Sequence, residues 1–135
     1  MPSLSESQLR TLVSAIDRIV PQDDFPSASQ AGCLDFLVRL IELERLGATY
    51  ASGLDGLEHE ASLLGHTFSE LSPPQQDAVL AACEVKESDS AWLVSPQQFL
   101  RILATQTIEG YYSDPGNGGN LGAVSWKMIG FKVTA

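Results

Sequence analysis

The chain has 135 residues, which is enough for one domain that holds a hydrophobic core without metals or disulfides. Its 44% of apolar residues is ordinary for a globular protein and excludes a disordered chain. The net charge of −9 disfavours nucleic acid and anionic lipid as partners. No apolar run approaches the ~20 residues that span a bilayer, so direct membrane insertion is excluded.

The first predicted helix begins after Ser5. Ser5 and Gln8 are predicted to form a capping box. In this motif the serine hydroxyl accepts a hydrogen bond from an unpaired backbone amide, and the Gln side chain accepts one from the backbone N–H of the serine. Apolar residues then recur at the spacing of one helical face, at Leu9, Leu12, Val13, Ile16 and Ile19. We expect the helix to end before Pro21, because the residue preceding a proline is pushed out of the helical region.

A second helix is predicted from a repeat of this cap at Ser27 and Gln30, and it extends to about Arg45. Its apolar positions are Leu34, Phe36, Leu37, Val38, Leu40, Ile41 and Leu43. They cover more than one face, so this segment is predicted to be a central helix packed on several sides.

Three further helices are predicted downstream. The third helix is predicted after Gly47, where a narrow apolar stripe is formed by Tyr50, Leu54, Leu57, Ala61 and Leu64. Gly53 and Gly56 each lower the stability of this helix by about 1 kcal/mol relative to Ala. Ser72-Pro73 and Ser95-Pro96 each place Ser at the N-cap and Pro at the first helical position, opening helices to about Val85 and Tyr112.

The segment from Ser113 to Ser125 is predicted to be a loop, because its Asp-Pro-Gly-Asn-Gly-Gly-Asn core favours turns. Trp126, Met128, Ile129 and Phe131 follow. The predicted fold is therefore all-α: a single domain over residues 1–135, a bundle of about five helices with an irregular Gly/Asn-rich C-terminal loop and an aromatic tail.

The loop at Asp114–Asn120 matches no known ligand motif. An EF-hand calcium loop needs a closing Glu at its twelfth position, which here is Ser125. Phosphate and dinucleotide cradles place their glycines between a strand and a helix, whereas these glycines follow a helix. The interpretation is a structural or partner-contacting loop.

Other candidate chemistry also favours structural readings. His59 and His66 are too far apart for the usual helical metal pair and are predicted at the surface. Asp23 and Asp24 precede the predicted Ser27 helix, where their negative charges interact favourably with the positive end of the helix dipole. Cys33 and Cys83 are predicted as small core residues, with a disulfide between them the less favoured alternative. No residue of this chain is predicted to be catalytic, cofactor-binding or metal-ligating.

The C-terminal third carries a resemblance to a known family. Three runs carry it: Glu109-Gly110-Tyr111-Tyr112-Ser113-Asp114-Pro115, then Gly118-Gly119-Asn120, then Trp126-Lys127-Met128-Ile129-Gly130-Phe131. Together they resemble the signature of the gluconate 2-dehydrogenase subunit 3 family. The run from Ile19 to Ala28, with Pro21, Asp23 and Pro26, resembles the N-terminal region of that family. The departures are Ser125, where Gly usually precedes the Trp, and Leu121-Gly122 in place of charged residues.

The resemblance implies a non-catalytic accessory subunit that binds and supports maturation of a large flavin-dependent dehydrogenase of the glucose-methanol-choline type, acting on gluconate or a related sugar. FAD belongs to that large subunit and haem c to a cytochrome c subunit that often joins it. The partner-binding candidates are Tyr111, Tyr112, Asp114, Gly118, Gly119, Asn120, Trp126 and Lys127. Among them the Gly-Gly-Asn loop is the better partner candidate, whereas Trp126 and Phe131 mainly cover the chain's own core.

Two questions stay open at the level of sequence. The alternative function is a stand-alone helical module that homodimerises or binds a small apolar ligand. The first nineteen residues contain no twin arginine and no basic region ahead of an apolar segment, which predicts a cytoplasmic protein. A periplasmic location requires a twin-arginine signal that was removed or that a partner carries.

Overall fold

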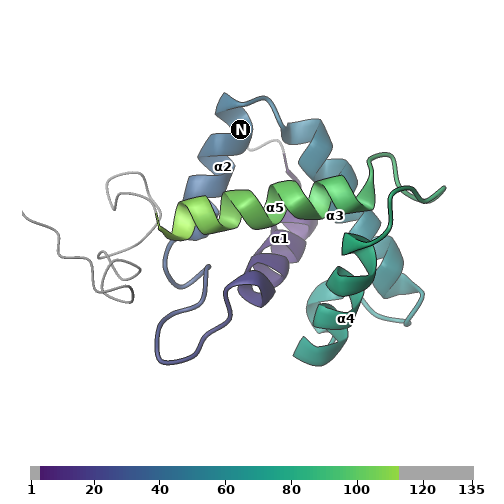
Figure 1. The fold of residues 1–135 in the computed structure, drawn as a ribbon, viewed down its shortest axis with the longest axis horizontal. Coiled ribbons are helices and arrows are strands. Elements are labelled where there is room, and N and C mark those ends of the chain that lie inside the picture. The colour runs from purple at the N-terminus through teal and green to yellow at the C-terminus, as the bar shows by residue number, and fades with distance from the viewer. Residues whose placement is uncertain (1–3, 113–135) are drawn as a thin grey trace, which may run out of the picture.

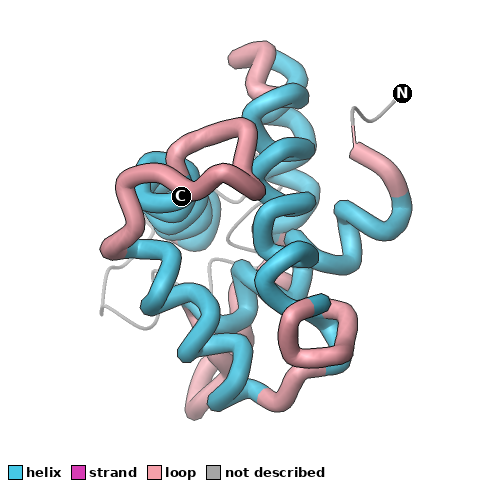
Figure 2. Tube along the Cα trace, turned by 90° about the vertical axis from the view of Figure 1, so that its right-hand side faces the viewer, coloured by secondary structure: helices cyan, strands magenta, loops and turns pink. Residues whose placement is uncertain are grey.

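The computed structural model describes residues 4–112, which form five α-helices and one 3₁₀ turn (Figure 1). In chain order these are α1 (Glu6–Ile19), α2 (Cys33–Leu43), α3 (Gly47–Ser62), η1 (Phe68–Glu70), α4 (Pro73–Glu84) and α5 (Pro96–Tyr111). Seen from the side, this part of the chain contains helices and loops and no strand (Figure 2). The predicted all-α class is confirmed, while the C-terminal loop and aromatic tail lie outside the described residues.

Serine caps begin three of the helices where the sequence predicted them. The hydroxyls of Ser5, Ser72 and Ser95 each accept a hydrogen bond from the amide three residues later. At Ser5 and Ser72 the Gln side chain also accepts from the backbone N–H of the serine, which completes the capping box. These caps satisfy amides that have no partner inside the helix.

The predicted start of the second helix at Ser27 is wrong. Ser27 and Gln30 do form the reciprocal contacts of a cap, with Ser27 N–H donating to Gln30 Oε1 at 2.8 Å. The chain then makes only turns, because Gly32 adopts a left-handed φ of 89° that interrupts helical hydrogen bonding. α2 therefore begins at Cys33.

α2 is not the central helix that the sequence predicted. α5 packs against α1, α2, α3 and α4, and Leu12 and Ile16 on the inner face of α1 are fully buried. In Figure 1 α5 crosses the molecule in front of α1. α2 buries only Cys33, Leu37 and Ile41 and packs mainly on α5. Its other apolar residues are half-buried or, at Leu43, exposed, so the width of its apolar surface does not reflect a central position.

Two glycines of α3 let bulky rings approach the helix backbone. A β-carbon on Gly53 would lie 2.3 Å from Phe99 of α5, and one on Gly56 would lie 2.3 Å from Trp92. Both glycines are buried. The two positions that the sequence presented as weak points of α3 are therefore contact points for the aromatic core.

The connection between α1 and α2 is fastened at both sides. Asp17 on α1 accepts hydrogen bonds from Ser29 N–H at 2.8 Å and Ser29 Oγ–H at 2.6 Å. From α5, the hydroxyl of Tyr111 donates to the Pro26 carbonyl at 2.7 Å. These hydrogen bonds hold the α1–α2 connection, which has no regular secondary structure, against α1 and α5.

Candidate partner-binding surfaces

The two tyrosines at the end of α5 have different environments. Tyr111 is 1% exposed, and burial raises the pKa of its hydroxyl, with Asp23 among the nearby charges. Tyr112 is 38% exposed and meets the Tyr111 ring edge-on, with centroids 5.5 Å apart. Of these two candidates, only Tyr112 is exposed at the surface, whereas Tyr111 is buried in the bundle. The other candidates, Asp114, Gly118, Gly119, Asn120, Trp126 and Lys127, lie outside the described residues.

An apolar hollow lies on one flank of α2. It has a volume of about 130 Å³ and is lined by Phe36, Arg39, Leu40 and Leu43. Leu43 is 76% exposed, and Phe36 and Leu40 are half-buried. Phe36 also lies directly against the backbone of Gly110, where a β-carbon would stand 2.6 Å from its ring. The hollow is therefore adjacent to the C-terminal turn of α5.

A larger apolar groove, the α3–α4 groove, lies between the end of α3 and the outer face of α4. Its volume is about 360 Å³. It is lined by Glu60, Leu63, Leu64, Gln75, Ala78, Val79 and Ala82. Leu63 is 68% exposed and Leu64 is 51% exposed, which is unusual for two adjacent leucines in a small protein. Ala78 and Ala82 of α4, together with Leu63 and Leu64 just after α3, give the groove a shape that admits an apolar side chain.

Sequence reasoning missed this groove. The sequence predicts Leu64 as part of the apolar stripe of the third helix, but that helix ends at Ser62 and a left-handed Gly65 turns the chain away. The available signal was the pair Leu63-Leu64 beside Gly65, combined with the Ala-rich helix that follows. Neither feature reveals by itself that the two segments are adjacent.

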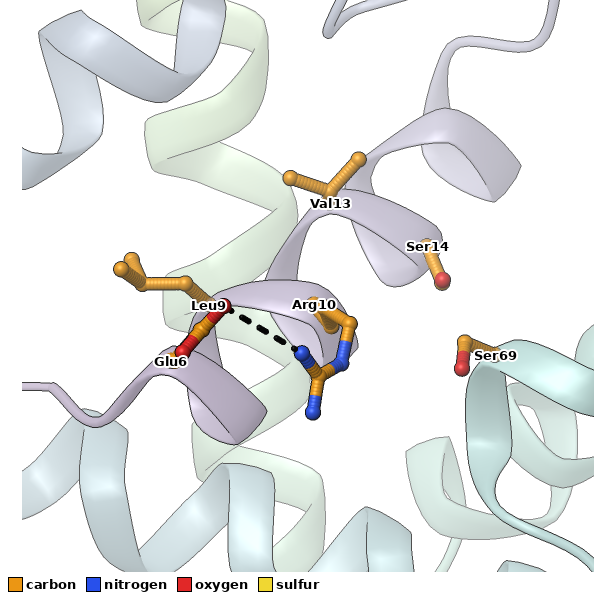
Figure 3. A pocket seen from close by; sticks show the side chains of 6 residues that line it. All are labelled: Glu6, Leu9, Arg10, Val13, Ser14 and Ser69. Atoms are coloured by element: carbon orange, nitrogen blue, oxygen red, sulfur yellow. Dashed lines mark ion pairs between the residues drawn. The ribbon is translucent and has the colours of Figure 1, made fainter.

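The hollow on α1 is wide and shallow. Figure 3 shows the Glu6–Arg10 ion pair on one side and Ser14 facing Ser69 on the other, with Leu9 and Val13 along the helix. Glu6 and Arg10 are exposed, and the ion pair spans 3.7 Å. An exposed pair of this kind contributes little binding energy, so this surface is a weak candidate for a site.

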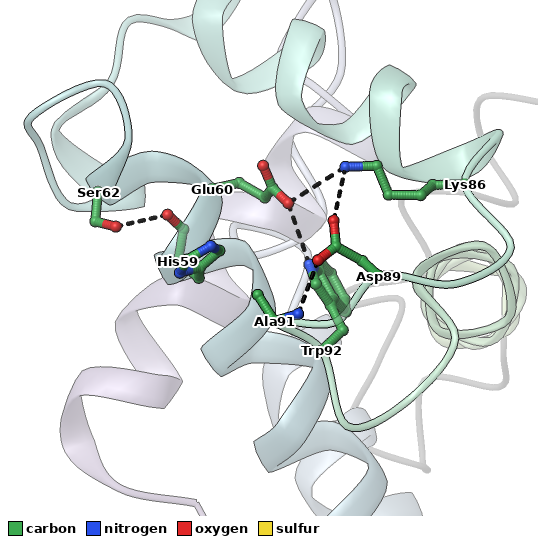
Figure 4. A network of polar contacts seen from close by, with 7 residues as sticks. All are labelled: His59, Glu60, Ser62, Lys86, Asp89, Ala91 and Trp92. Atoms are coloured by element: carbon green, nitrogen blue, oxygen red, sulfur yellow. Dashed lines mark hydrogen bonds and ion pairs between the residues drawn. The ribbon is translucent and has the colours of Figure 1, made fainter.

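A polar cluster ties the connection before α5 to α3 (Figure 4). Glu60 of α3 accepts from the indole N–H of Trp92 at 3.2 Å and pairs with Lys86 Nζ at 3.5 Å. Lys86 also pairs with Asp89 at 3.1 Å, and Asp89 accepts from the Ala91 N–H. These contacts raise the pKa of Lys86, the Asp89 hydrogen bond most of all, and lower that of Asp89. Glu60 thus binds the indole of Trp92, whose ring lies against Gly56, and Lys86 links Glu60 to Asp89.

The other polar groups of the interior are likewise paired. Glu58 accepts from Thr11 Oγ1–H at 2.7 Å and from the Phe68 N–H at 3.2 Å. Cys33 and Cys83 are free and buried, as predicted, and burial raises their pKa to about 12 and about 11. Over residues 4–112 no buried side-chain nitrogen or oxygen lacks a hydrogen bond, and no three acidic, His or Cys residues gather as for a metal.

The remaining predicted residues lie where the sequence placed them or serve a local turn. His59 and His66 are both exposed, as predicted. Asp23 accepts from the Phe25 N–H at 2.9 Å and closes a turn, so it does not cap a helix at Ser27. No helix within residues 4–112 is long and apolar enough to cross a membrane.

Comparison with known proteins identifies a family over nearly the whole chain. The family model described as gluconate 2-dehydrogenase subunit 3 matches residues 6–132. That range includes all five helices, the α1–α2 connection and the C-terminal signature. Searches of curated proteins and of solved structures find no match. This match over residues 6–132 shows that the chain belongs to the gluconate 2-dehydrogenase subunit 3 family.

Proposed function

We propose that this chain is a non-catalytic accessory subunit that binds and supports maturation of a large flavin-dependent dehydrogenase of the glucose-methanol-choline type. The substrate of the complex is gluconate or a related sugar. The family match supports a subunit of a dehydrogenase complex. In this proposal FAD resides in the large subunit and haem c in a cytochrome c subunit, while this chain supplies only binding surface.

The α3–α4 groove is the observation that carries this proposal. A stable interface buries about 800 Å² on each partner, which is about a tenth of the 7452 Å² surface of this chain. The groove supplies the apolar centre that such an interface needs, because Leu63 and Leu64 protrude beside the small residues Ala78 and Ala82. The loop with Asp114, Gly118, Gly119 and Asn120 is proposed as a second contact.

Co-expression with a flavoprotein of this type encoded beside the gene tests the proposal. The two products are expected to co-purify, with more soluble, flavin-loaded large subunit than when it is expressed alone. A Leu63→Glu, Leu64→Glu double variant is expected to lose co-purification, because two charges would be buried unpaired. Leu93→Glu is the matched control, since Leu93 is 89% exposed and lies outside the groove.

Two results would contradict the proposal. One is an unchanged flavin content and solubility of the large subunit in the presence of this chain. The other is equal co-purification of the double variant and the control, which would remove the groove from the interface. A homodimer that forms through the groove without any flavoprotein, seen by size-exclusion chromatography, would instead favour a stand-alone helical module.

A further inference from the structure

The polar side chains that line the α3–α4 groove are already bound within the chain. The described lining has two of them, Glu60 and Gln75. Glu60 accepts from the indole N–H of Trp92 and pairs with Lys86, as Figure 4 shows. Gln75 Oε1 accepts from the Ser72 backbone N–H at 3.0 Å as part of the α4 cap. An occupant of the groove therefore meets chiefly apolar atoms.

The groove also carries no uncompensated charge, although the chain as a whole has a net charge of −9. Glu60 is the only charged residue of the described lining, and Lys86 lies 3.5 Å from its carboxylate. A charged segment of a partner would find no opposite charge here. An uncharged apolar segment gains free energy by covering the exposed side chains of Leu63 and Leu64.

An α-helix is the element whose backbone suits such a groove. An extended peptide brings backbone N–H and C=O groups that need partners when they are buried. Peptides of this kind find those partners by adding to the edge of a sheet, but the described part of the chain contains no strand. A helix satisfies its own backbone internally, so it can place an apolar face in a groove that offers few hydrogen-bonding groups.

The groove has room for about two apolar side chains. A cavity of about 150 Å³ holds one benzene ring, whereas the groove measures about 360 Å³. Two side chains that are three or four residues apart lie on one face of a helix. Ala78 and Ala82 form one wall, and their short side chains allow a second helix to approach α4 closely.

We propose that the α3–α4 groove receives an amphipathic α-helix of the large subunit. Two leucine-sized side chains of this helix lie between Leu63 and Leu64 on one side and Ala78 and Ala82 on the other. The helix presents no charge to the groove, so the contact is insensitive to ionic strength. This inference rests on the proposed function and specifies the kind of segment that the partner contributes.

Filling the groove tests where the helix lies. The measured quantity is the dissociation rate of the complex co-purified with the full chain. Ala82→Leu is expected to raise this rate by about tenfold or more, because the added side chain takes the space of the partner's. Ala81→Leu is the matched control, since Ala81 is also an exposed alanine of α4 but does not line the groove. It is expected to change the rate by less than about twofold.

Photo-crosslinking tests the helical form of the occupant. A p-benzoylphenylalanine in place of Leu64 is expected to attach to residues three or four apart in one segment of the large subunit, as identified by mass spectrometry. An increase from about 0.1 M to about 1 M NaCl is expected to leave the dissociation rate of the complex unchanged. Urea unfolding of each free variant checks that the bundle is retained.

Several results would overturn the inference while the accessory role stands. They are equal dissociation rates of Ala82→Leu and Ala81→Leu, release of the large subunit by salt, and attachment to alternate residues of an extended segment. Attachment to a second copy of this chain would overturn the choice of occupant. If the parent chain and the large subunit form no complex at all, the proposed function fails and this inference fails with it.

Discussion

Gly53 of α3 lies so close to Phe99 of α5 that a β-carbon on residue 53 would stand 2.3 Å from Cδ1 of the ring. Phe99 is 1% exposed and is packed edge-on against Tyr50, with centroids 5.6 Å apart, and tilted against Trp92. The ring therefore has no space into which to retreat. This contact sets the separation of α3 and α5.

Gly53→Ala is expected to destabilise the protein. Alanine would gain about 1 kcal/mol of helix propensity, but overpacking a buried ring costs about 1–3 kcal/mol, so we expect no net gain and a loss of up to about 2 kcal/mol. Urea unfolding measures the difference. Ser52→Ala, next in sequence and without an added β-carbon, is the control and should change stability little. A Gly53→Ala protein more stable than the parent would contradict the contact.

Asp77→Asn is expected to reduce stability in a pH-dependent way. Asp77 accepts two hydrogen bonds from Arg18, at 2.8 and 3.0 Å, and these lower its pKa below 3.8. The unfolded chain therefore binds this proton more tightly than the folded chain does. The contribution of the pair is full above the unfolded-state pKa and is lost as pH falls through the folded-state pKa.

The size of that contribution is small, at most about 1 kcal/mol, because Asp77 is largely exposed to solvent and such pairs are screened. The measurement compares the free energies of unfolding of the parent and Asp77→Asn at about pH 7 and about pH 2.5. A difference that persists undiminished at the lower pH would exclude the ion pair as its cause.

The two cysteines are expected to resist thiol reagents in the folded protein. Burial raises the pKa of Cys33 to about 12 and of Cys83 to about 11, so almost no reactive thiolate exists near pH 8. Ellman's reagent should react with both only at the rate of unfolding and stoichiometrically in urea. Ser88→Cys, at an exposed position, provides a control thiol that reacts at once. Rapid labelling of two thiols in the parent protein would disprove the buried placement.

Tyr111→Phe is expected to loosen the connection between α1 and α2. The variant leaves the Pro26 carbonyl without the Tyr111 hydroxyl, at a cost of about 1 kcal/mol. Hydrogen exchange should become faster at the amides of Ala28 and Cys33, which bond within and after this connection. The amides of α4 serve as an internal reference. Equal exchange at Ala28 in both proteins would show that the Tyr111 hydroxyl does not hold the connection.

Local signals in the sequence were sufficient for most helix starts. Ser5, Ser72 and Ser95 each complete a cap within four residues, so the interaction that defines the helix start is contained in the pattern. At Ser27 the same pattern forms the same hydrogen bonds but no helix follows, because the left-handed Gly32 interrupts the chain. A capping box thus predicts a turn more reliably than it predicts the helix after it.

Long-range packing was beyond the reach of the sequence pattern. Nothing near Gly53 or Gly56 reveals that Phe99 and Trp92, some forty residues downstream, require the space above them. The sequence likewise shows the apolar width of α2, but it does not show that α5 is the helix that contacts the other four in residues 4–112. The candidate surfaces combine segments that are remote in the chain, and of the two predicted partner-binding residues within 4–112 only Tyr112 is exposed.

The contacts of α5 have a consequence for folding. Within residues 4–112 this helix packs against α1, α2, α3 and α4, so it joins segments that are far apart in the sequence. Contacts of this kind require large loops to close before they stabilise the fold. Docking of α5 is therefore expected to be the step that limits the rate at which the bundle forms.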